Sequence, residues 1–128
     1  MIEIHLIEQA IESYESPATV EAVSGHGALV EFAGVIRPEE QGSQISGIRY
    51  EAYTAMAENV MRERLEVLQQ KHGFLAAEVI HRIGSVDVGC QAIRVRIWSA
   101  HRKEAFAALI AFMDELKQEV PIWKVATY

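Results

Sequence analysis

Two long helical periodicities, each preceded by strand-like segments, constrain the fold of this chain more than any other feature. The first covers residues 55–72 and is capped by Thr54; its apolar stripe is Met56, Val60, Met61, Leu65 and Leu68. The second covers residues 102–118; its predicted inward residues are Phe106, Leu109, Ile110, Met113 and Leu116. Gly73 and Pro121 are the respective stop signals.

The segments between the helices read as strands. Strand formers dominate residues 2–7, 26–37, 45–53, 77–84 and 91–99. In the last of these, Ile93, Val95 and Ile97 share one face, while Arg94 and Arg96 take the other. We expect one or two helical turns over 8–14 and the start of a second short helix at Ser16–Pro17. We also expect a polar loop over 38–43 and a turn near 87–89. The order predicts one α+β domain over 1–128, with a mixed or antiparallel sheet, rather than a doubly wound parallel sheet.

Composition excludes several functional classes. The chain has 128 residues, half of them hydrophobic, and a net charge of −6 without a basic run, which argues against nucleic-acid binding. Its one cysteine, Cys90, cannot form a disulfide framework or a zinc site within one chain. No apolar stretch reaches the roughly 20 residues that span a bilayer. The N-terminus lacks the basic start of a signal peptide, so we expect a cytoplasmic protein that holds no metal.

In an acidic chain, the positions of the basic residues are informative. His101 and Arg102 stand where a strand runs into a helix, a junction that suits an anion such as phosphate. They could equally cap and solvate the helix start. Lys117 in the last helical turn could simply interact favourably with the helix dipole. Lys124 could be a surface residue whose aliphatic stem packs on Trp123. The residues alone therefore indicate an α+β domain with a candidate anion site, but no reaction.

Five segments, in order, resemble the large subunit of molybdopterin synthase. They cover nearly the whole chain: GALVEFAGVIR at 27–37, YEAYTAMAE at 50–58, VIHRIGSVDVG at 79–89, SAHRKEAFAALIAFMDELK at 99–117 and VPIWK at 120–124. The resemblance implies an α/β-hammerhead-like fold and a homodimer within a heterotetramer. It also implies a small ubiquitin-like sulfur-carrier subunit, whose C-terminal Gly-Gly thiocarboxylate supplies two sulfurs to cyclic pyranopterin monophosphate. No cofactor is implied, because the sulfur arrives on the carrier.

The same resemblance assigns roles to individual residues. Lys117 and Lys124 match the catalytic lysines, and the substrate-binding positions are Arg37, His101, Arg102, Phe32 and Met113. The chain departs from the family pattern at Val35, Cys90, Val125 and Ala126, and it ends at Tyr128, before a basic residue that many members lend across the dimer. Two alternatives to a sulfurtransferase therefore stay open. One is a catalytically silent scaffold that docks the carrier, and the other is an unrelated anion-binding module.

Overall fold

The computed structural model describes residues 1–15 and 24–128. The helix start expected at Ser16–Pro17 lies outside the described residues. Most of the other predicted elements appear within a residue or two of their expected bounds. The turns expected over 8–14 form one short 3-10 helix, η1 (Ile11–Ser13).

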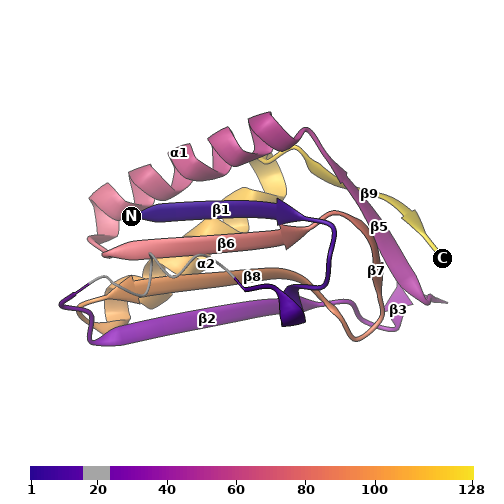
Figure 1. The fold of residues 1–128 in the computed structure, drawn as a ribbon, viewed down its shortest axis with the longest axis horizontal. Coiled ribbons are helices and arrows are strands. Elements are labelled where there is room, and N and C mark those ends of the chain that lie inside the picture. Colours follow the sequence, from indigo (N-terminus) through magenta and orange to yellow (C-terminus); the bar gives the residue numbers. More distant parts are fainter. Residues whose placement is uncertain (16–23) are drawn as a thin grey trace.

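The main sheet has four strands in the order β1-β6-β8-β2 (Figure 1). The parallel pair is β1 with β6, and the β6–β8 and β8–β2 pairs are antiparallel, so of the two predicted kinds of sheet, mixed or antiparallel, the structure has the mixed one. The bounds are β1 Ile2–Ile7, β2 Ala28–Val35, β6 Ala76–Arg82 and β8 Gln91–Ser99.

Two long helices, α1 (Thr54–His72) and α2 (Arg102–Glu119), cover one face of the main sheet. Figure 1 shows α2 running behind the four strands. Alternate strand residues point toward the helices and form the core with them. The core includes Ile4, Val79, Val95 and Ile97 from the strands and Leu65 and Phe112 from the helices. This arrangement confirms the predicted α+β class and the shared face of the β8 isoleucines and valine.

The helices differ from their predicted faces in detail. Thr54 is the first residue of α1 and not its cap, and Met56 is exposed. In α2 the buried residues are Ala105, Ala108, Leu109 and Phe112. The predicted inward residues Phe106 and Ile110 are 51% and 64% exposed. The buried face of α2 thus combines two small alanines with Leu109 and Phe112, and Phe106 and Ile110 lie outside it.

A second, three-stranded antiparallel sheet in the order β7-β5-β9 stands at the end of the main sheet (Figure 1). Its strands are β5 Gly47–Ala52, β7 Gly84–Asp87 and β9 Ile122–Thr127. The sequence predicted β5 but assigned no strand to β7 or β9. The predicted loop over 38–43 contains a small hairpin of β3 (Glu39–Glu40) and β4 (Ser43–Gln44).

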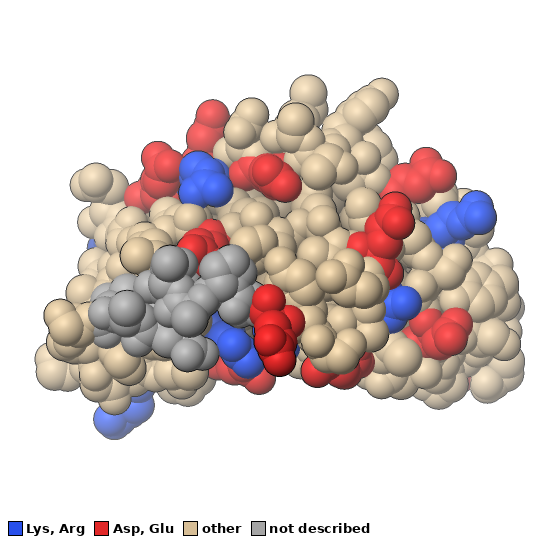
Figure 2. All heavy atoms as spheres, in the orientation of Figure 1, with Lys and Arg blue, Asp and Glu red and all other residues tan. Residues whose placement is uncertain are grey.

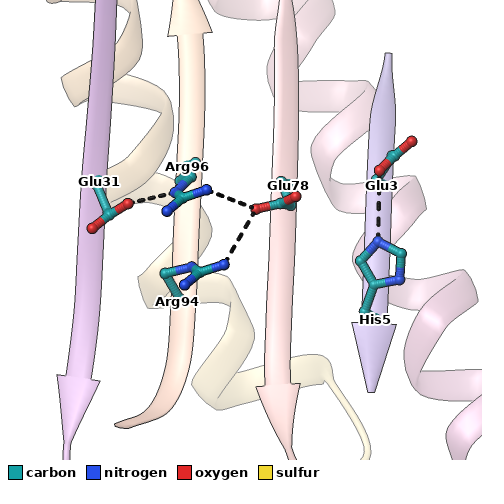
Figure 3. Close-up of polar contacts among 6 residues, drawn as sticks. All are labelled: Glu3, His5, Glu31, Glu78, Arg94 and Arg96. Carbon is teal, nitrogen blue, oxygen red and sulfur yellow. Dashed lines mark hydrogen bonds and ion pairs between the residues drawn. The ribbon is translucent and has the colours of Figure 1, made fainter. Parts of the chain in front are cut away.

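The face of the main sheet opposite the helices carries charge. Figure 2, in the same orientation as Figure 1, shows acidic side chains spread over this side, with isolated basic groups between them. Across the strands, Arg96 lies between Glu31 and Glu78, and Arg94 also approaches Glu78 (Figure 3). Within residues 1–15 and 24–128, no helix is long and apolar enough to cross a membrane.

Candidate active site

A cavity of about 360 Å³ opens where the two sheets meet the C-terminal end of α2. Both sheets and the helix contribute to its wall. The lining residues are Phe32, Gly34, Val35, Ile36, Tyr50, His81, Ala92, Ile93, Met113, Leu116, Lys117, Ile122 and Lys124. The wall is thus mainly apolar, with a few polar groups, which is the composition typical of a small-molecule site.

The cavity brings together the two lysines predicted to be catalytic. Lys117 lies in the last turn of α2, and no carboxylate among residues 1–15 and 24–128 forms an ion pair with it. Lys124 lies on β9 directly opposite Tyr50 of β5, and its Nζ is 3.0 Å from Oε2 of Glu40. Lys124 also lines a neighbouring hollow of about 380 Å³ that includes Glu40. Lys124 therefore lies between the cavity and this neighbouring hollow.

The apolar wall includes both predicted apolar positions, Phe32 on β2 and Met113 on α2. Between Phe32 and the end of β2, Gly34 keeps the space open. A Cβ atom at Gly34 would lie 2.8 Å from Cγ2 of Ile93, which is closer than van der Waals contact allows. The absence of a side chain at Gly34 thus leaves room for Ile93 on the neighbouring strand β8.

His81 and Tyr50 also line the cavity, although the sequence analysis did not select either of them. Their rings meet edge to face, with centroids 5.3 Å apart and an interplanar angle of 76°. Burial lowers the pKa of His81, although its hydrogen bond to the backbone opposes that effect. Burial, and then the charge of Glu40, raises the pKa of Tyr50. The alternation of side chains along the strand could have indicated that His81 points inward, because it shares a face of β6 with the core residues Ala77 and Val79.

His101 and Arg102 lie at the other end of α2 from Lys117. Fifteen residue steps separate Arg102 from Lys117, which is roughly 22 Å along a helix. Both side chains are exposed, and the backbone N–H of His101 donates to Oε2 of Glu104 at 3.2 Å. A single chain therefore does not bring His101 and Arg102 to the cavity that holds Lys117.

Arg37 is nearer to the cavity. It follows Ile36, a lining residue, and its side chain is exposed. No acidic group in the described part of the chain forms an ion pair with its guanidinium. The structure thus gathers Phe32, Met113, Lys117 and Lys124, and leaves Arg37 beside them.

A second group of polar side chains lies on the opposite face of the main sheet. Ligand-type atoms of Glu3, His5 and Glu78 lie within 4.8 Å of one another, a spacing that could hold a cation. However, the carboxylate of Glu78 already lies 3.7 Å from Nη1 of Arg96 and 4.0 Å from Nη2 of Arg94 (Figure 3). Two guanidinium groups at that distance disfavour a further cation.

Comparison with known proteins identifies the family. The MoaE protein family matches residues 6–119. The chain belongs to the MoaE family. It is 38% identical over 98 residues to the molybdopterin synthase catalytic subunit of Thermoplasma volcanium, covering 77% of this chain and 72% of that protein. It is 36% identical over 118 residues to the protein of the same name from Pyrococcus abyssi, covering 92% of this chain and 75% of that one.

A solved structure agrees with this assignment to the MoaE family. The crystal structure of molybdopterin synthase from Staphylococcus aureus superposes with a TM-score of 0.81 at 26% identity, covering 96% of this chain and 93% of that one. The match extends over both sheets and both long helices, so the architecture around the cavity is that of the family. The family predicted from the five sequence segments, that of the large subunit of molybdopterin synthase, is thus confirmed by the family match and by these relatives.

Proposed function

We propose that this chain is the catalytic subunit of a molybdopterin synthase, and that sulfur is transferred in the cavity between its two sheets. The observation that carries the proposal is the convergence of Lys117 and Lys124 on one mainly apolar cavity in a chain of the MoaE family. The two relatives described above, each called a molybdopterin synthase catalytic subunit, support it.

The proposed sulfur donor is a small ubiquitin-like carrier subunit with a C-terminal Gly-Gly thiocarboxylate. The acceptor is cyclic pyranopterin monophosphate, which receives two sulfurs from two carriers in turn and becomes the dithiolene. A Gly-Gly tail has no side chains, so it suits a cavity bordered by Phe32 and Met113. The thiocarboxylate is an anion, and apolar walls strengthen its attraction to a lysine ammonium.

The two lysines have different surroundings and therefore different proposed roles. Lys117 has no carboxylate partner in the described residues, so its ammonium is available to the thiocarboxylate and to the oxyanion that develops when the carrier's carbonyl carbon is attacked. Lys124 is held by Glu40 in an exposed ion pair, which is weak in water. An anionic substrate group can replace Glu40 at Lys124.

The remaining basic residues point to a site shared between two copies of the chain. About 22 Å of helix keeps His101 and Arg102 away from Lys117 of the same chain, and one small substrate does not bridge that gap. In the proposed homodimer, His101 and Arg102 of one protomer bind the phosphate of substrate held at the lysines of the other. Arg37, beside the cavity, contacts the same substrate. Two carriers complete a heterotetramer.

Reconstitution tests the proposal directly. The purified chain is mixed with thiocarboxylated carrier and cyclic pyranopterin monophosphate, and dithiolene product is measured over time. We expect product from the wild type and a rate about 10²–10³-fold lower from Lys117→Ala, as for loss of one group that stabilises an oxyanion. Lys71→Ala, an exposed lysine near the end of α1, is the matched control and should keep full activity.

The outcomes separate the alternatives. A stable complex with the carrier but no product from the wild type would leave only the silent scaffold. Phosphate binding without any complex with a Gly-Gly carrier would contradict the sulfur-transfer proposal and leave only an anion-binding function. A monomeric mass at micromolar concentration would contradict the shared site.

A further inference from the structure

His81 is a titratable side chain of the cavity to which the proposed function gives no role. His81 lies near the end of β6, on the face that carries Ala77 and Val79 into the core, and it reaches the cavity where that core ends. Only 6% of its surface is exposed. A histidine buried at the wall of an apolar cavity, beside two lysines, is a candidate for chemistry.

The contacts of the ring determine which nitrogen is available. Nδ1 lies 2.8 Å from the backbone carbonyl oxygen of Arg82. Because a carbonyl only accepts hydrogen bonds, Nδ1 carries the proton and donates it to this oxygen. In the neutral ring, Nε2 then carries a lone pair, and no group among residues 1–15 and 24–128 hydrogen-bonds to it. The edge-to-face contact with Tyr50 helps to hold the ring in this orientation.

The other titratable groups of the cavity do not offer such a lone pair. A lysine ammonium, as at Lys117 and Lys124, has three donors and no acceptor. Tyr50, whose pKa is raised, keeps its phenolic proton at neutral pH. Burial lowers the pKa of His81 and so favours the neutral ring. Among these four groups, His81 is thus the one suited to accept a proton.

The proposed sulfur transfer requires such an acceptor. When the sulfur of a thiocarboxylate bonds to a substrate carbon, the carrier and the substrate become joined by a thioester. The product keeps its sulfur only if water then breaks the bond between the acyl carbon and that sulfur. A new bond forms from the water oxygen to the acyl carbon, and one water proton must be removed as that bond forms.

We propose that His81 is the general base for this hydrolysis, an inference that rests on the proposed function. Nε2 of His81 accepts a proton from the attacking water, while Lys117 stabilises the oxyanion on the acyl carbon. When the intermediate collapses, the C–S bond breaks and the proton on Nε2 passes to the departing sulfur. The carrier leaves as a carboxylic acid, which ionises in solvent, and the substrate keeps a thiol. No oxidant or reductant is needed.

The test is a single-turnover reaction in the full complex of the chain with its carrier. Thiocarboxylated carrier and cyclic pyranopterin monophosphate are mixed with wild type or His81→Gln, and intact mass follows the covalent carrier–substrate thioester. Glutamine keeps a polar group of similar reach but is not a base. We expect the thioester to form in His81→Gln and to persist, with hydrolysis slowed by about 10²–10⁴-fold. His72→Gln on α1 is the matched control and should behave as wild type.

Equal hydrolysis rates in wild type and His81→Gln, with no accumulated thioester, would overturn the assignment while leaving the synthase function intact. A wild type that makes neither thioester nor product would instead overturn the proposed function itself. If His81→Gln does not fold, the wild-type pH profile decides. Thioester hydrolysis should rise with pH to a plateau, with its inflection below the ordinary histidine pKa of 6.5. A profile without that acid limb refutes a role for His81 as base.

Discussion

The ion pairs among Glu31, Arg96, Glu78 and Arg94, on the face of the main sheet opposite the helices, lead to a specific prediction about stability. Glu78 and Glu31 flank the same arginine, Arg96, on neighbouring strands (Figure 3). Their surroundings differ, because the side chain of Glu78 is 3% exposed and that of Glu31 is 46% exposed. Glu78 also lies 4.0 Å from Arg94, which is itself buried. Removing each carboxylate charge in turn therefore compares a buried ion pair with a surface one.

The expected costs follow from this difference in burial. Glu78→Gln leaves Arg94 and Arg96 without their buried counter-charge. We expect a loss of about 3 kcal/mol in the free energy of unfolding, near the lower end for a broken buried pair, because the amide oxygen still accepts a hydrogen bond. Glu31→Gln should cost at most about 1 kcal/mol, because water screens its charge and solvates Arg96.

Urea unfolding at a fixed protein concentration measures both costs. With a slope of about 1.5 kcal/mol/M, the midpoint should fall by about 2 M for Glu78→Gln and by less than about 0.7 M for Glu31→Gln. The double variant Glu78→Leu/Arg94→Leu should recover part of the loss, because it leaves fewer unpaired buried charges. Equal costs for the two single variants would refute the argument from burial.

Three further predictions concern the core, a helix end and pH. Phe112→Ala removes a fully buried ring from the helix–sheet interface; it should cost about 3–5 kcal/mol and lower the Tm in calorimetry by roughly 10–20 °C, whereas Phe112→Leu should cost much less. Gly73 ends α1 at φ 75°, so Gly73→Ala should cost about 1–2 kcal/mol in urea unfolding and Gly73→Asn less; no difference between them would count against strain at this position. The folded-state pKa of His81 is lowered, so the unfolded chain binds more protons below pH 6.5. Stability should therefore be fully present above that pH and decline as the pH falls below it, and His81→Gln should flatten this dependence in urea titrations.

The sequence predicted the individual strands of the main sheet and both long helices well, because their residue patterns are clear, but it did not predict the order of the strands. The residues of β8 alternate between core and charge, and Gly73 ends α1 where expected. The strands β7 and β9 were missed for a physical reason. They are edge strands that owe their structure to pairing with β5, and pairing between segments distant in sequence leaves no local periodicity.

The candidate site was predictable only in part. Phe32, Met113, Lys117 and Lys124 were selected through family resemblance, and the structure gathers them around one cavity. The helix predicted over 102–118 already implied that Arg102 and Lys117 lie about 22 Å apart, whereas the family resemblance assigned both residues to one active site. Tyr50 was not selected because a tyrosine in a strand is ordinary. It reaches Lys124 through the β5–β9 pairing, which the sequence did not predict, and it lines the same cavity as Lys117.

The length of α2 also sets the angle around the helix axis at which Lys117 lies relative to Arg102. Each residue turns the helix by about 100° and advances it by about 1.5 Å. Inserting a single residue between Ala108 and Phe112 would leave Arg102 in place but swing Lys117 about 100° around the axis, away from the cavity wall that it now lines. Insertions in this helix are thus expected to disable the proposed site even where the core adapts.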